Sequence, residues 1–568
     1  MEPNRTFALE TYARRSLNYL DRMADDFGLP YFNVFWTEPA AAAHDWPDYA
    51  DVRSRQLQAA GMVRAMSGRT PALWRTWREA VLAMVEPSTG LLVRPRTPWS
   101  RPEVEMGGHA LTLYAFVTDF AVSGDERLRD AARRMIAGMA PSWRTRWPTE
   151  EPQFAAGFTI KSLMAAVRTA GIEEALPFAR ELARVVLEQA GLFGPDDTFR
   201  HGGHMHGNLR TLLGLYDYAR YVGDAALERR VQNVFRWVNT QKTRFGFLPE
   251  VIGRRGDIVN CETCALMDWL GLAASMALAG RDELWGEIER MVRNHLVESQ
   301  VADTSWLAAE PARADTAQFS WRGVGDRMRG GWAGWSSPTH ILAARETLNA
   351  HWGTEELRDK TRAFQNCCGG SGPHALYIAW AVAASFEAGR LSVNLHVDRD
   401  IQEATVRCFQ PWRGATTVTL KRACRVRIRL PDFVRPGEVT VAGRTGPIGC
   451  DVRGGWIDAG ERPAGECLEV AYPLPVVREL VSVGNPGRRA WGYAVTWKGD
   501  SVIRMEPTGE MPAAGSSDFD LREVPVYYGR EGPGPLYRRE HLAAEAPGDG
   551  PAEAALETGR APVNHWLS

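Results

Sequence analysis

Apolar residues recur at three- and four-residue spacing through the first two-thirds of the chain, which predicts a long succession of helices. Three similar units begin at Gly108, His204 and Cys261. Each has a helix that is apolar on nearly all sides, a break with glycine and aspartate, and then a charged amphipathic helix. Glycine ends a helix in the left-handed conformation and aspartate caps the next one, so each unit is a hairpin. We expect the apolar helix to lie inside and the amphipathic helix outside.

Tandem helical hairpins either stack into a solenoid or close into a toroid. Long segments that bear glycine, tryptophan and histidine precede the inner helices, and they favour a toroid whose loops crowd one mouth as a site. After about residue 388 the pattern changes to short, alternating, β-branched runs with turn residues between them, which predict an antiparallel β-sandwich. The predicted fold class is therefore multidomain α+β.

This change of pattern also predicts how the chain is divided. We expect a helical toroid over residues 1–387, a β-sandwich over 388–480 and a second β segment over 481–542. Residues 543–568 are rich in Ala, Glu, Gly and Pro, and this composition predicts a mobile tail.

Composition and charge exclude several classes of function. The 67 basic and 69 acidic side chains nearly cancel, and no block of like charge indicates a nucleic-acid groove or an anionic membrane surface. The first residues lack the apolar core of a secretory signal, and no run approaches the roughly 18 to 20 apolar residues of a membrane span. Eight cysteines in so long a chain are not a disulfide scaffold. We expect a cytoplasmic monomer or homodimer without nucleic-acid or membrane partners.

Tryptophan is abundant, with 21 residues, and its flat apolar face suits stacking on sugar rings, although most tryptophans fill cores. The segment 321–335 should cover the mouth of the toroid, and we predict substrate contacts for Trp332 and Trp335 within it. Its arginines could bind a carboxylate or phosphate on the substrate. The charged residues of this segment are Arg322, Asp326, Arg327 and Arg329.

Two short motifs carry candidate chemistry. Glu262-Thr-Cys264 opens the third inner helix, and Cys367-Cys368-Gly-Gly-Ser-Gly-Pro precedes another apolar run. Three thiols and a carboxylate at helix starts can converge inside a toroid, where they would suit the tetrahedral preference of Zn²⁺. Helix N-termini also favour their deprotonated forms. The same residues are equally compatible with small buried thiols in tight helix packing.

The Glu-Thr-Cys motif, the later Cys-Cys pair, the helix that begins near His204 and the β-sandwich after them together resemble the β-L-arabinofuranosidases of glycoside hydrolase family 127. The resemblance covers most of the chain in order and motif. It implies an (α/α)6 barrel with β-sandwich domains and a zinc ion held by Glu262, Cys264, Cys367 and Cys368. It also implies that Cys367 is the nucleophile of a retaining hydrolysis through a glycosyl thioether.

A general acid/base is also required, to protonate the leaving oxygen and then activate water. The family places a glutamate upstream of its Glu-Thr-Cys motif; Glu250 is the best match here, and Asp257 is the alternative. His204 resembles the substrate-binding histidine of the family. We predict sugar contacts for His204, for His206 and, by its place in the first repeat, for His109. The histidines around His204 could instead form a metal site of their own.

These observations predict a zinc-dependent retaining glycosidase that acts from chain ends on a β-L-arabinofuranoside or a related furanoside, in a small oligosaccharide or glycoside. The Gly-Gly-Ser-Gly-Pro continuation after the Cys-Cys pair departs from the usual family pattern, which leaves the sugar open. One alternative is a zinc-dependent hydrolase or lyase on an acidic sugar, with metal-activated water. Another is a non-catalytic carbohydrate-binding toroid with structural zinc.

Overall fold

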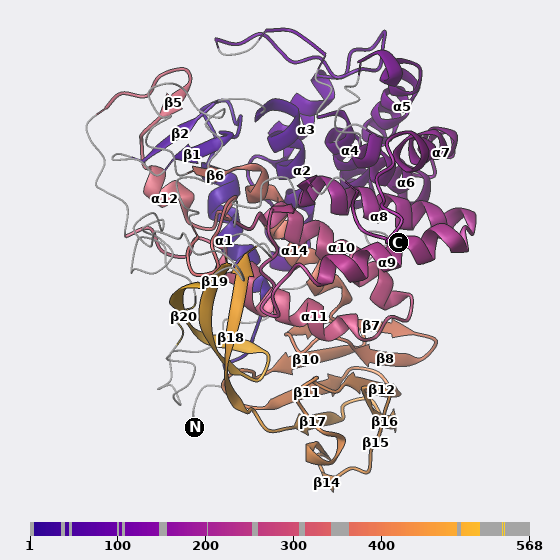
Figure 1. The fold of residues 1–568 in the computed structure, drawn as a ribbon, viewed down its shortest axis with the longest axis vertical. Coiled ribbons are helices and arrows are strands. Elements are labelled where there is room, and N and C mark those ends of the chain that lie inside the picture. Colours follow the sequence, from indigo (N-terminus) through magenta and orange to yellow (C-terminus); the bar gives the residue numbers. More distant parts are fainter. Residues whose placement is uncertain are drawn as a thin grey trace.

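The computed structural model describes residues 5–35, 40–44, 48–98, 101–104, 108–146, 156–200, 203–252, 260–305, 313–341, 363–484, 490–511, 537 and 539. Figure 1 shows the helices at one end of the long axis and most strands of the later chain at the other. The predicted mixture of helices and antiparallel sheets is confirmed. The expected tail at 543–568 and the candidate Asp257 lie outside the described residues. Every helix among the described residues is too short or too polar to span a bilayer.

Six helices within the described ranges are buried on nearly every side and form a closed circuit, in which each contacts the next and the last contacts the first. The circuit runs through α2 (Arg53–Ser67), α4 (His109–Ser123), α6 (Phe158–Ala170), α8 (Met205–Val222), α10 (Thr263–Leu278) and α14 (Cys367–Val382). The sequences of α4, α10 and α14 have almost no polar face to present to water, so packing on all sides is their stable arrangement. The expected burial of the first helix in each unit is confirmed.

Further helices pack against the outside of this circuit. They are α3 (Trp74–Ala83) on α2, α5 (Glu126–Arg146) on α4, α7 (Ala175–Arg184) on α6, α9 (Ala225–Asn239) on α8 and α11 (Leu284–Met291) on α10, while α1 (Leu9–Arg22) contacts α2 and α14. The turn from α8 to α9 has the predicted chemistry. Gly223 ends α8 with a φ of +75°, and the Asp224 carboxylate caps α9 by accepting from the backbone N–H of Leu227 at 3.0 Å.

Two sheets that follow α14 share a second apolar core, which includes Val406 and Val418 of one sheet and Val426 and Ile457 of the other. In sheet order, the first contains β14 (Gly446–Pro447), β13 (Thr440–Gly443), β17 (Cys467–Ala471), β11 (Ala415–Leu420), β10 (Ala404–Cys408) and β9 (Arg399–Asp400). The second contains β15 (Asp451–Arg453), β16 (Trp456–Arg462), β12 (Cys424–Arg429), β8 (Arg390–Val393) and β7 (Ala384–Glu387).

One strand pair departs from the predicted antiparallel pattern. Strands β8 and β12 are parallel, so the prediction of purely antiparallel pairing is wrong there. Between these two strands the chain passes through the other sheet as β9, β10 and β11. Such a long connection can return in either direction, whereas a tight hairpin imposes antiparallel pairing.

Smaller sheets complete the described structure. The chain's last described strands, β18 (Val476–Gly484), β19 (Ala490–Lys498) and β20 (Ser501–Met511), form an antiparallel sheet whose Tyr493 and Trp497 join the core of the helical part. A four-stranded sheet has the order β5 (Phe319–Ser320), β2 (Ala41–Ala43), β1 (Asn33–Phe35) and β6 (Ala363–Gln365). A two-stranded sheet pairs β3 (Gly203–His204) with β4 (Val251–Ile252), and α12 spans Val324–Met328. The sheets of β6 and of β3 and β4 lead into the candidate site.

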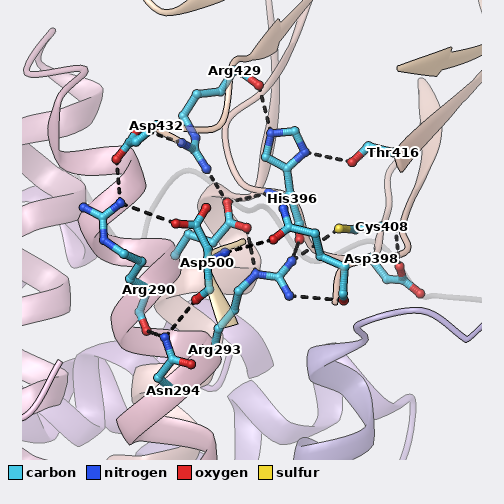
Figure 2. A network of polar contacts seen from close by, with 12 residues as sticks. Arg290, Arg293, Asn294, His396, Asp398, Cys408, Thr416, Arg429, Asp432 and Asp500 are labelled. Atoms are coloured by element: carbon cyan, nitrogen blue, oxygen red, sulfur yellow. Dashed lines mark hydrogen bonds and ion pairs between the residues drawn. The ribbon is translucent and has the colours of Figure 1, made fainter. Parts of the chain in front are cut away.

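A buried ion-pair network joins the helical part to the sheets. Glu289 of α11 is fully buried, and its carboxylate accepts from Arg293 Nε at 2.7 Å. It also accepts from the backbone N–H of His396 at 2.9 Å and pairs with Arg429 of β12. Figure 2 shows Arg290 of the helical part joined to Asp432 and Asp500, and Arg293 joined to Cys408 on the strand side. Burial acts to raise the pKa of Glu289, but the two neighbouring arginine charges outweigh it and lower that pKa.

Replacing Glu289 with glutamine is expected to lower the free energy of unfolding by about 3–5 kcal/mol, because Arg293 and Arg429 would stay buried without their counter-charge. Urea denaturation at pH 7 measures this loss. Since the pKa of Glu289 is lowered in the folded state, its contribution is complete above the ordinary value of 4.5 and declines as the pH falls. The difference between wild type and Glu289→Gln should therefore shrink in acid. The control is Asp451→Asn, which removes one partner of the exposed pair with Arg453 and should leave the urea midpoint unchanged. An equal loss of stability in Glu289→Gln and Asp451→Asn would contradict the prediction.

Candidate functional site

The start of α10 carries one half of the candidate site. The backbone of Cys261 forms two hydrogen bonds with that of Ser336, of 2.8 and 2.9 Å. Glu262 is extended at the N-cap position, and the Thr263 hydroxyl donates to the backbone carbonyl of Ala333 at 2.7 Å. These bonds fix the direction of the first turn of α10 and of the two candidate ligands beside it.

The start of α14 carries the other half. Asn366, just before the cysteine pair, donates its backbone N–H to the Phe32 carbonyl at 2.7 Å and accepts from the Tyr19 hydroxyl at 2.8 Å. The glycines after the pair allow close packing, since a Cβ atom added to Gly372 would come within 2.1 Å of the Trp332 ring. The unusual Gly-Gly-Ser-Gly continuation therefore has a packing reason, since added Cβ atoms would meet Tyr19 at Gly369, the Arg55 backbone at Gly370 and the indole at Gly372.

The four candidate ligands converge as the sequence predicted. Glu262, Cys264, Cys367 and Cys368 each offer a ligand atom within 4.8 Å of the others. The Cys264 and Cys368 sulfurs are 3.4 Å apart, and those of Cys367 and Cys368 are 4.0 Å apart. These cysteines are free thiols rather than disulfides. Cys264 and Cys368 are fully buried and Cys367 is 5% exposed, so Cys367 is the thiol most open to an incoming molecule.

The electrostatic setting keeps these thiols protonated unless a cation joins them. Burial raises the pKa of Cys264 and of Cys368 well above the usual value. At Cys367 a hydrogen bond with Cys264 acts to lower the pKa, but the contact with Cys368 and burial outweigh it, and this pKa is raised as well. A divalent cation among the sulfurs would favour the thiolate forms instead.

A histidine and a second glutamate lie beside the cluster. The pairing of β3 with β4 places His204 opposite Val251, next to Glu250. The His204 Nε2 atom is 2.7 Å from a Glu262 carboxylate oxygen and 3.4 Å from a Glu250 carboxylate oxygen. The side chain of His204 is 25% exposed, which is more than any of the four clustered ligands. The open side of the site is therefore the side of His204 and Glu250.

The charges in this group stabilise one another. Burial acts to lower the pKa of His204, but the Glu262 carboxylate and the contact with Glu250 raise it to about 10. Burial acts to raise the pKa of Glu262, but the His204 charge lowers it to about 2. The two side chains thus form an imidazolium–carboxylate pair. Glu250 is held in place by a hydrogen bond from the Asn260 amide to its carboxylate.

A second polar group lies behind the cluster. Arg55 of α2 places its Nη1 atom 3.7 Å from the Cys264 sulfur and its Nη2 atom 2.9 Å from His206 Nε2. The other ring nitrogen of His206 is 2.5 Å from the Asp268 carboxylate. Burial and the Arg55 charge lower the pKa of His206 well below its usual value, and burial raises that of Asp268 to about 7. His206 therefore connects buried polar groups of α2, α8 and α10 rather than lying on the open side.

Other predicted substrate contacts are enclosed by protein. His109 is fully buried at the start of α4, and its Nε2 atom accepts from the backbone N–H of Leu92 at 2.9 Å. Trp332 is 1% exposed and donates its indole N–H to the Ser16 hydroxyl at 3.1 Å, and Trp335 is also buried. The contacts of these three residues with a substrate stay predictions.

The arginines of the 321–335 segment have protein partners. Arg322 pairs with Asp26 at 3.0 Å, and Arg329 pairs with Asp326 at 3.0 Å. The guanidinium group of Arg327 donates to several backbone carbonyls. These partners weaken the hypothesis that the segment binds a carboxylate or phosphate of the substrate.

Arg55 and Asp268 were missed by the sequence analysis. Asp268 is the only charged residue in the sequence of α10, and a lone carboxylate in an apolar helix is a usable signal, because such groups are buried only with partners. Arg55 gives no comparable signal. It lies among other polar residues of α2, and only the meeting of α2, α8 and α10 shows that it is buried.

Comparisons with known proteins identify relatives by fold alone. No protein-family model and no curated protein matches the chain. Among solved structures, a glycoside hydrolase matches with 15% identity and a TM-score of 0.57, over 80% of this chain and 77% of that one. A family 127 β-L-arabinofuranosidase from Geobacillus stearothermophilus T6 matches with 15% identity and a TM-score of 0.54, over 81% and 78%. Another family 127 β-arabinofuranosidase matches with 14% identity and a TM-score of 0.55, over 87% and 81%.

These matches extend over most of each chain, and the likeness lies in the arrangement of the backbone. The resemblance that the two cysteine motifs indicated in the sequence is thus confirmed at the level of fold.

Proposed function

We propose that the chain is a retaining glycoside hydrolase that releases a terminal β-linked L-arabinofuranose, or a related furanose, from a small oligosaccharide or glycoside. The closed circuit of inner helices and its outer partners support an (α/α)6 barrel as the catalytic domain, and the two sheets with one core support an attached β-sandwich. The observation that carries the proposal is the convergence of Glu262 and three cysteines beside Glu250, on a fold shared with family 127 enzymes.

The donor set fits a zinc ion. Zinc–sulfur bonds of about 2.3 Å in a tetrahedral site would separate two sulfurs by roughly 3.8 Å. The separations of 3.4 Å for Cys264 and Cys368 and of 4.0 Å for Cys367 and Cys368 lie on either side of this value. Three sulfur donors favour zinc over magnesium or calcium, which prefer oxygen. When bound, zinc would hold these thiols as thiolates at neutral pH.

Cys367 is the best candidate for the nucleophile. It is the most exposed of the three clustered cysteines, and it belongs to the same compact group as Glu262, whose carboxylate contacts His204 on the open side. Its thiolate would attack the anomeric carbon, so that a carbon–sulfur bond forms as the bond to the leaving oxygen breaks. The resulting glycosyl thioether has the inverted configuration, and a second inversion restores the original one.

Glu250 is the candidate acid/base. Its carboxylate lies within 4.8 Å of the ligand atoms of His204 and Glu262, on the open side of the cluster. In the first step Glu250 would give a proton to the leaving oxygen. In the second step it would take a proton from a water molecule as the water oxygen attacks the anomeric carbon and the Cys367 thiolate departs. His204 would orient Glu250 and donate to a sugar hydroxyl.

A second candidate function follows from another group of possible ligands. His204, Glu250 and Glu262 also place one ligand atom each within 4.8 Å of one another. A metal held there would favour a hydrolase that activates water and forms no covalent intermediate. Mass spectrometry of the intact protein during turnover separates the two functions, since only the first produces a glycosyl adduct on Cys367.

The proposed function predicts one zinc ion per chain and hydrolysis that depends on it. Dialysis against a strong chelator should abolish hydrolysis, and added zinc should restore it, because the thiols revert to protonated forms without a cation. Elemental analysis counts the metal, and nitrophenyl furanosides and pyranosides in both anomeric configurations identify the sugar. A metal-free protein with full activity would contradict the proposal.

A further inference from the structure

The guanidinium group of Arg55 lies directly behind the thiol cluster, and each of its three nitrogens has a protein partner. Its Nη1 atom is 3.7 Å from the Cys264 sulfur and donates to the Ser371 hydroxyl oxygen at 3.1 Å. Its Nη2 atom is 2.9 Å from His206 Nε2, and its Nε atom pairs with Asp51 one turn earlier on the chain. Arg55 is 4% exposed. This side chain therefore has one fixed orientation, with a donor aimed at one of the sulfurs.

The partners of Arg55 determine which of its donors faces the cluster. The Nδ1 atom of His206 lies 2.5 Å from the Asp268 carboxylate, so the ring donates there and its Nε2 atom is left to accept from Arg55. That bond uses one of the two N–H groups of Nη2, and Asp51 accepts from Nε. The two N–H groups of Nη1 lie toward Cys264 and Ser371.

The charges of the proposed metal site explain why a positively charged side chain lies beside it. Three thiolates and one carboxylate carry four negative charges; a divalent ion would cancel two of them, and the His204 imidazolium pairs with the carboxylate. The rest would lie in a buried site, where uncompensated charge is costly. Arg55, which also pairs with Asp51, places a positive charge beside the sulfurs. Of the three clustered cysteines, only Cys264 receives a hydrogen bond from Arg55 among the described residues. A hydrogen bond withdraws electron density from a sulfur and makes it a poorer nucleophile.

We propose that Arg55 is a positioning residue that makes the three thiolates chemically different. Its hydrogen bond keeps Cys264 as a ligand sulfur, whereas Cys367 stays the reactive sulfur. This inference rests on the proposed function, because it concerns the same metal-binding group. It adds a residue on α2 to a site that the sequence motifs place only on α10 and α14.

Cobalt substitution tests this role without reference to activity. Co²⁺ replaces zinc in thiolate sites and gives a sulfur-to-cobalt charge-transfer band whose energy falls as electron density on sulfur rises. Arg55→Met removes both the charge and the donor, so the band should move to longer wavelength. Its zinc affinity, measured by competition with a coloured chelator, should fall about 10–100-fold. Arg55→Lys keeps the charge and should restore most of the wild-type affinity.

Arg210→Met provides the matched control. Arg210 of α8 is also an almost fully buried arginine, 3.7 Å from the Asp268 carboxylate, but it contacts none of the sulfurs among the described residues. A merely structural role for Arg55 would lower the melting temperature of both variants and leave the band of both unmoved. If Arg55→Met does not fold, Arg55→Gln carries the test, because it keeps a polar group and loses the charge.

The outcomes separate this inference from the proposed function. A wild-type protein that binds no cobalt, or shows no charge-transfer band, would overturn the metal site itself. A wild-type band that stays at the same wavelength in Arg55→Met or Arg55→Gln, with zinc affinity within twofold, would overturn the role of Arg55 alone. A shifted band in the Arg55 variants and an unshifted one in Arg210→Met supports it.

Discussion

Replacing Cys367 with serine is expected to reduce hydrolysis by at least about 10⁴-fold, because a serine hydroxyl at neutral pH is a far weaker nucleophile than a thiolate. Initial rates on the best nitrophenyl furanoside, with zinc content measured on the same sample, test this result. In the wild type, intact-protein mass spectrometry of rapidly quenched reactions should show one added glycosyl group. Peptide mapping should place that group on Cys367.

Two controls show whether the loss is specific. Cys450, a half-buried cysteine between β14 and β15, is not a member of the cluster, so Cys450→Ser should keep wild-type rates. Cys368→Ser removes a fully buried member of the cluster and should lower zinc content together with activity. A Cys367→Ser protein that retains zinc and turns over at the wild-type rate would contradict the assignment of the nucleophile.

Replacing Glu250 with glutamine is expected to lower kcat by about 10²–10⁴-fold on substrates with a poor leaving group, since glutamine can neither donate nor accept the proton in transit. The loss should be smaller for the first step with nitrophenolate, a leaving group that departs without a proton. Comparing an alkyl furanoside with its nitrophenyl counterpart measures the difference. Folding and zinc content should be preserved, because Glu250 is outside the four-ligand cluster.

The matched control for this variant is Glu283→Gln. Glu283 is an exposed carboxylate that pairs with Arg281 on the outer surface, so its loss should leave both substrates unaffected. If Glu250→Gln cleaved both classes of substrate at wild-type rates, another group would have to supply the proton. Asp257, outside the described residues, would then be the residue to replace next.

Local chemistry made part of the fold predictable. The glycine and aspartate at the break between α8 and α9 are read directly from the sequence, because Gly223 and Asp224 act through bonds to residues a few positions away. The strand pairing of β8 with β12 was not predictable, since residues more than thirty positions apart in sequence are brought together by the packing of the two sheets. The start of β7 at Ala384 was also missed, because its sequence continues the apolar run of α14 without a break.

The candidate site likewise has a part that the sequence predicts and a part that it does not. Cysteine is rare, and three of them with a glutamate at helix starts form a pattern that a sequence reveals, so the cluster of Glu262, Cys264, Cys367 and Cys368 was expected and is present. Arg55 was not expected, because arginine is common and its burial depends on three helices from distant parts of the chain. The enclosure of Trp332 was equally hidden, since it depends on the contact with Gly372.

The ion-pair network around Glu289 limits how this protein can be cut into fragments or joined to parts of other proteins. A fragment that ends at residue 387 would keep Glu289 and Arg293 but lose Arg429, one of the two arginines that neutralise the carboxylate. Only Ala383 separates α14 from β7, so no linker marks a place to cut. A chimera that grafts the sheets of another protein of this fold onto these helices would need an arginine at the place of Arg429. The sheets are thus part of the framework that supports α14, the helix that begins with Cys367 and Cys368.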